Sequence, residues 1–156
     1  MNVANYGEVA RFDSLEPGDF FLAAYRNSGI FGIVVTYAEG PPYVCLLIND
    51  PAENPCTISS LSPHESVFKI HNARIQPKIA ARDLQIASHP LGSLLMTREG
   101  TFLVALNDRK SVVRVNVVTG RVHAADTSSL MFAKWEVVID DAHNDTRVIL
   151  QYPPSA

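Results

Sequence analysis

Two short clusters of histidine, asparagine and arginine are the residues of this chain whose types best suit ligand binding. One reads His71-Asn72-Ala73-Arg74 and the other His143-Asn144-Asp145-Thr146-Arg147. Imidazole, amide and guanidinium groups together suit an anionic or polar ligand. If the chain folds as two similar halves, a pseudo-two-fold axis could bring both clusters into one groove. The candidate ligand-binding residues are therefore His71, Asn72, Arg74, His143, Asn144 and Arg147.

Two other interpretations of these clusters stay open. Each cluster could simply be a turn before the last strand of its half, because Asn and Asp favour turns through local hydrogen bonds. Asp140 and Asp141 with His143 and Asp145 could also hold a divalent cation, but they lack the spacing of a calcium loop and a helical His pair. We favour turns and a solvated acidic loop, and we assign no metal, cofactor or catalytic residue.

Composition indicates a folded protein and gives no electrostatic reason to expect a duplex nucleic-acid partner. The chain has 156 residues, of which 47% are hydrophobic and 19% charged, which argues against disorder. Its net charge of −3 provides no general attraction to a phosphate backbone. The five tyrosines and Trp135 could form a stacking platform for single strands, but core packing explains them equally well.

The N-terminal residues and the lack of a long apolar run favour a cytoplasmic location. The first residues lack the basic start and apolar run of a secretory signal, and no apolar stretch is long enough for a membrane span. Cys45 and Cys56 flank the turn expected at 49–55, and we expect both to be free thiols in a reducing compartment.

Strand signals dominate the pattern, so we predict an all-β protein. The apolar runs are short, rich in Val, Ile and Phe, and ended by Gly, Pro, Asn and Asp. Residues 77–87 are the one helical candidate, and they could equally form a strand. The expected strands are 8–12, 20–26, 31–37, 43–48, 57–61, 66–70, 94–97, 101–106, 111–118, 121–125, 134–139 and 147–152.

Tight turns are expected at three glycines. Glu16-Pro17-Gly18-Asp19 suits a type II turn, and Gly100 and Gly120 stand where a hairpin needs a left-handed residue. The run 43–48 is apolar on both faces, so a second half or a second subunit must cover it.

An internal duplication is indicated by similar residues at a nearly constant offset. Gly18 is matched by Gly92, since 92 − 18 = 74, and Gly29 by Gly100, since 100 − 29 = 71. We therefore predict two pseudo-symmetric copies of a five- to six-stranded antiparallel barrel or sandwich, residues 1–76 and 77–156, packed as one globular unit.

The segment Phe12-Asp13-Ser14-Leu15-Glu16-Pro17-Gly18-Asp19-Phe20 resembles the opening of small uncharacterised β-barrel proteins of bacteria and phages. The segment 115–122 is similar to a later hairpin of such proteins. The resemblance implies a compact β-barrel and no catalytic residue.

Three functions remain open. The first is a non-enzymatic β-module that binds a protein partner or itself as a homodimer, since no nucleophile elbow, phosphate loop or zinc motif occurs. The second is a binder of a small polar ligand, anion or carbohydrate in the groove between the copies. The third is a hydrolase that uses the His and Asp loops.

Overall fold

The computed structural model shows an all-β protein. It describes residues 6–25, 28–49, 55–78, 84–85, 91–125, 130–140 and 145–154. Because short β-branched and aromatic runs alternate with turn residues, the chain forms strands and one 3₁₀ turn at Phe12–Ser14. The strands are β1 (Gly7–Arg11), β2 (Phe20–Tyr25), β3 (Ser28–Val35), β4 (Val44–Leu47), β5 (Thr57–Ser60), β6 (Ser66–Ile70), β7 (Ala73–Pro77), β8 (Leu84–Gln85), β9 (Leu94–Thr97), β10 (Gly100–Leu106), β11 (Val112–Asn116), β12 (Val122–Ala124), β13 (Leu130–Phe132), β14 (Trp135–Asp140) and β15 (Thr146–Tyr152).

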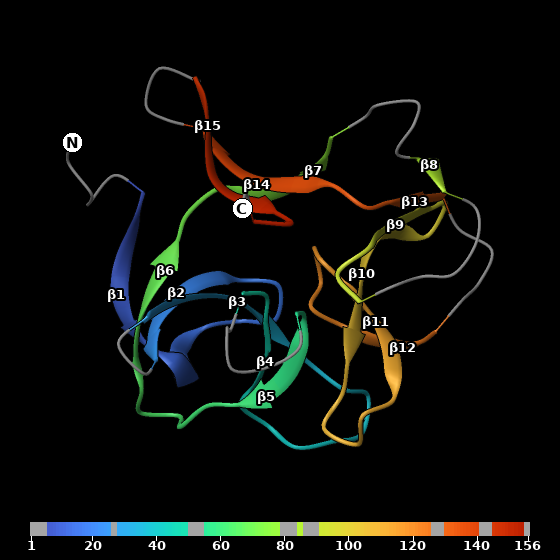
Figure 1. The fold of residues 1–156 in the computed structure, drawn as a ribbon. Coiled ribbons are helices and arrows are strands. Elements are labelled where there is room, and N and C mark those ends of the chain that lie inside the picture. Colours follow the sequence, from blue (N-terminus) through green and yellow to red (C-terminus); the bar gives the residue numbers. More distant parts are fainter. Residues whose placement is uncertain are drawn as a thin grey trace.

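The strands form two sheets. One is twelve-stranded, with the order β1-β6-β2-β3-β4-β5-β10-β9-β13-β8 and with β11 and β12 branching from β10. The other has three strands in the order β15-β14-β7. In Figure 1, strands β1 to β6 lie on one side, strands β8 to β13 lie on the other, and the three-stranded sheet runs along the top. We refer to β1–β6 as the first unit and to β8–β13 as the second unit.

The two units share one strand order. Pairing runs β1-β6-β2-β3-β4-β5 in the first unit and β8-β13-β9-β10-β11-β12 in the second, with antiparallel neighbours throughout. The opening turns also match in their hydrogen bonds. The N–H groups of Gly18 and Gly92 donate to the carbonyls of Val34 and Val104, at 2.8 and 2.9 Å.

Among the described residues, strand pairing links the two halves of the chain at three places. In the three-stranded sheet, β7 from the first half of the chain pairs with β14, and Ile75 lies opposite Val137. Elsewhere a parallel contact joins Leu106 to Thr57, and another joins Thr36 to Arg121. Leu106 is the last residue of β10 and Thr57 the first of β5, whereas Thr36 directly follows β3 and Arg121 directly precedes β12. The two contacts therefore occupy equivalent places in the matching strand orders of the two units.

Most of the core is common to both units. The largest cluster of buried side chains includes Phe20, Ile33 and Leu46 from the first unit, Leu94 and Leu103 from the second, and Trp135 from the three-stranded sheet.

Strand β4 is buried on both faces, as expected from its sequence. Val44 and Leu46 join the common core, whereas Cys45 and Leu47 pack in a separate cluster with Phe12. Cys45 and Leu47 are thus covered within the first unit, whereas Val44 and Leu46 are covered by a core to which the second unit contributes, so the expected cover by the other half is present on that face.

The all-β prediction is confirmed, and each of the twelve expected strands is present within two or three residues at its ends. Strands β7 and β13 were not expected, whereas β8 lies in the range 77–87, for which a strand was the alternative to a helix. Residue 77 belongs to β7 and residues 84–85 form β8, so a helix across 77–87 is wrong for these positions; the rest of that range lies outside the described residues. The sheet is open: the described strands do not close into a barrel, and the architecture is sandwich-like.

Candidate binding cavity and apolar groove

His71 and Asn72 form the turn between β6 and β7. Asn72 has a left-handed φ of 58°, which Asn tolerates better than most residues. The His71 side chain is partly exposed, and its Nε2 atom lies 3.8 Å from Oε1 of Glu8. Neither residue lines the cavity or the groove described below. Their observed environment is that of a surface turn.

Arg74 and Arg147 lie on opposite faces of the three-stranded sheet. Arg74 pairs in register with Val138 and Arg147 with Ile139, and successive residues of a strand point to opposite faces. Arg74 forms an ion pair with Asp140, with 2.7 Å between Nη1 and Oδ2. The two arginines therefore do not converge. The other predicted site residues, His143 and Asn144, lie outside the described residues.

The acidic loop shows no cation site in the part that the structure describes. Asp140 binds Arg74 and accepts a 3.0 Å hydrogen bond from the Thr146 hydroxyl. Asp141 and His143 are outside the described residues, and the described ranges contain no group of three potential metal ligands.

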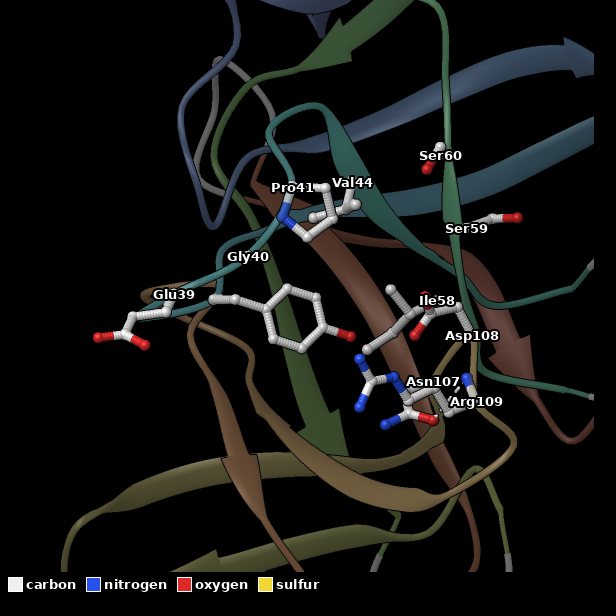
Figure 2. A pocket seen from close by; sticks show the side chains of 11 residues that line it. Glu39, Gly40, Pro41, Val44, Ile58, Ser59, Ser60, Asn107, Asp108 and Arg109 are labelled. Carbon is white, nitrogen blue, oxygen red and sulfur yellow. Dashed lines mark hydrogen bonds between the residues drawn. The ribbon is translucent and has the colours of Figure 1, made fainter.

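A cavity of about 600 Å³, which we call the junction cavity, lies where the two units meet. The first unit contributes the segment 37–44 after β3 and three residues of β5. The second unit contributes the turn after β10 (Figure 2). Its lining residues are Tyr37, Glu39, Gly40, Pro41, Val44, Ile58, Ser59, Ser60, Asn107, Asp108 and Arg109.

The turn that carries Asp108 and Arg109 is held by Asn107. Its Oδ1 atom accepts the backbone N–H groups of Arg109 and Ser111, at 3.0 and 2.8 Å. Lys110 takes the left-handed position, with a φ of 58°. Figure 2 shows the Asp108 and Arg109 side chains directed toward the cavity, whereas the Glu39 carboxylate points away. The hydrogen bonds therefore fix the backbone from which a carboxylate and a guanidinium enter the cavity.

The Tyr37 hydroxyl lacks a hydrogen-bond partner. Its oxygen is buried, and no partner is found within the described part of the chain. Burial, and secondarily the negative charge of Asp108, raise the pKa of Tyr37 above its usual value, so the phenol stays neutral and keeps its proton. A buried hydroxyl without a partner costs free energy, and a bound polar group would recover it.

A second hollow, the apolar groove, lies between the first unit and β15. It has a volume of about 340 Å³ and is lined by Tyr6, Leu22, Phe31, Phe68, Ile70, Ile139, Arg147, Val148 and Ile149. The exposed fractions of Leu22, Val148 and Ile149 are 40%, 47% and 38%, which is unusual for such residues side by side. Strand β15 pairs only with β14 among the described strands, so its outer edge is unpaired there.

Sequence reasoning did not identify either hollow. In the sequence Tyr37 is only one of five tyrosines, and Asn107, Asp108 and Arg109 match no binding motif. Their sequence signal is a polar hairpin turn, which is common on surfaces. Residues 37–44 and 107–109 meet only through tertiary packing.

The described residues include no helix that is long and apolar enough to cross a bilayer. No protein-family model matches the chain, and comparisons with curated proteins and with solved structures find no match either.

Proposed function

We propose that this protein is a non-catalytic binding module that takes a small polar ligand in the junction cavity. The observation that carries the proposal is a cavity of about 600 Å³ between the units with a buried, unpartnered hydroxyl at Tyr37. Ligand sites are typically clefts of roughly 300–1,000 Å³, lie at the junctions of structural units, and combine apolar walls with a few polar groups. Val44 and Ile58 supply such walls here.

A ligand screen with a cavity-filling variant tests this proposal. Ligand-observed NMR with mixtures of amino acids, short peptides, sugars and carboxylic acids should give hits with the wild-type protein. Ser60→Trp places an indole at the cavity wall and should remove those hits. Ser66→Trp is the matched control, because Ser66 is exposed on β6 and does not line the cavity. Hits that survive in Ser60→Trp, or no hits at all, would contradict the proposal.

A second candidate function is self-association through the apolar groove. The exposed Leu22, Val148 and Ile149 beside the unpaired edge of β15 favour it. The occupant that we propose is a second copy of the chain, because two identical strand edges can pair antiparallel about a two-fold axis and so close the assembly. This second candidate agrees with the homodimer expected from the sequence. Binding of a different protein to the same groove is the alternative outcome of its test.

We also propose that residues 1–76 and 77–156 arose by tandem duplication. The shared strand order supports this, and so does the pairing of β7 with β14. Gly18 and Gly92 have φ angles of 94° and 86°, and Gly120 and Cys56 have 71° and 55°, as equivalent turn positions would.

We further propose a cytoplasmic location. Both cysteines are free thiols, and a reducing compartment keeps thiols in this state.

A further inference from the structure

We propose that the ligand of the junction cavity is a zwitterion with an apolar side chain, of the size of an amino acid or a dipeptide, whose carboxylate binds Arg109 and whose ammonium binds Asp108. This inference rests on the proposed function and names the ligand class for the same cavity.

The first observation is the pair of charged side chains at the cavity, those of Asp108 and Arg109. Asp108 and Arg109 are exposed neighbours on one turn, and neither side chain has a hydrogen bond or an ion pair within the described ranges. Both side chains are directed toward the cavity (Figure 2). A guanidinium and a carboxylate that do not bind each other leave one site for an anion and one for a cation. A ligand that carries both charges satisfies both.

The other groups of the cavity are consistent with that ligand. Glu39 also lines the cavity, but its carboxylate points away, so the cavity presents one acidic and one basic group rather than an excess of acid. The neutral Tyr37 phenol can donate a hydrogen bond to a ligand carboxylate, which gives its hydroxyl the missing partner.

The apolar wall selects the rest of the ligand. Val44 and Ile58 are buried, with exposed fractions of 4% and 3%, and Pro41 lies beside them in the lining. An aliphatic side chain placed against this wall is removed from water at a gain of roughly 25 cal/mol per Å². Sugars and dicarboxylates lack such a group, so the wall disfavours them.

Titration calorimetry with leucine and leucyl-leucine as probes tests the inference. At least one of them should bind the wild-type protein with a dissociation constant of about 1 mM or lower. Leucinamide lacks the carboxylate and 4-methylpentanoate lacks the ammonium, so each should bind at least about tenfold more weakly than leucine. Arg109→Gln should weaken leucine about tenfold and leave leucinamide unchanged. Asp108→Asn should weaken leucine and leave 4-methylpentanoate unchanged.

Arg98→Gln is the control for the loss of an arginine, because Arg98 is exposed in the turn before β10 and does not line the cavity. It should bind leucine as the wild type does. If both probes fail to bind while other hits are lost in Ser60→Trp, the zwitterion inference is wrong and the binding function stands. If the probes bind but Arg109→Gln and Asp108→Asn have no effect, the assignment of the charges is wrong. If nothing binds the wild type, both proposals fail.

Discussion

Gly18 and Gly120 lie against each other where the two units meet: a Cβ atom placed on Gly120 would be 2.5 Å from the backbone nitrogen of Gly18. A Cβ atom on Gly18 would be 2.1 Å from the carbonyl oxygen of Val118. Both glycines have left-handed φ angles, of 94° and 71°, as their turn positions predicted. Glycine is therefore required at both positions for two reasons. The backbone conformation disfavours most other residues, and the contact leaves no space for a side chain.

Gly18→Val and Gly120→Val should each lower the free energy of unfolding by more than about 2 kcal/mol, since conformational strain adds to the steric clash. Urea denaturation followed by circular dichroism measures the change. Gly29→Val is the control, because a Cβ atom at Gly29 meets nothing within 4 Å and its φ is not left-handed. An effect at Gly18 no larger than that at Gly29 would show that the turn relaxes.

Turn chemistry and alternation were enough to predict most of this fold. The sequence of β4 is apolar on both faces, and both faces are indeed buried, because a different cluster of buried side chains packs against each one. β7 was missed because Ala73 to Pro77 contains a single large aliphatic residue and ends in proline. This strand exists because β14, about sixty residues later, provides its hydrogen-bonding partner, and local pattern carries no such information.

The candidate site was harder to predict for the same reason. Arg74 and Arg147 follow similar residues in the sequence, but the register of β14 with its two neighbours puts them on opposite faces. The junction cavity joins the segment after β3 to the turn after β10. Only the contact between the units brings Tyr37 near Asp108, and no spacing along the chain encodes it.

Lys110 provides a second test of backbone conformation, on the turn that bears Asp108 and Arg109. It is exposed and its φ is 58°, so its side chain contributes strain without compensating burial. Lys110→Gly should raise the free energy of unfolding by about 0.5–1 kcal/mol, and Lys110→Val should lower it by about 1 kcal/mol or more. Thermal and urea denaturation both measure this. Equal stabilities of the two variants would contradict the left-handed assignment.

The two thiols should make stability fall in alkaline solution. Burial raises the pKa of Cys45 and of Cys56 from 9.0 to about 12, so in the folded protein both keep their protons at pH values where the unfolded chain loses them. Because folding raises these pKa values, the contribution of the two neutral thiols to the free energy of unfolding is complete below pH 9.0. It is lost as the pH rises from 9.0 toward 12.

The free energy of unfolding should therefore decrease by about 1 kcal/mol per pH unit and per thiol above the unfolded pKa. Urea titrations at several alkaline pH values measure the slope, and Cys45→Ala and Cys56→Ala should each reduce it. In the native state both thiols should react slowly with a disulfide reagent, at the rate of unfolding rather than at the rate of a free thiol. Fast modification of folded protein would show that one of them is accessible.

Self-association through the apolar groove is the last prediction. Ile149 lies on β15 and lines this groove, and 38% of the surface of Ile149 is exposed. The outer edge of β15 is unpaired among the described strands. Sedimentation over about 1 μM to 1 mM should show a monomer–dimer equilibrium, because covering these side chains gains roughly 25 cal/mol per Å². Ile149→Glu should give a monomer, since a carboxylate is costly to bury in an apolar contact. Val118→Glu is the control, because Val118 is 75% exposed and lies outside the groove, and this variant should dimerise as the wild type does. A wild-type protein that stays monomeric at every concentration would exclude the second copy as the occupant of the groove, and a dimer that Ile149→Glu leaves intact would place the contact on another surface.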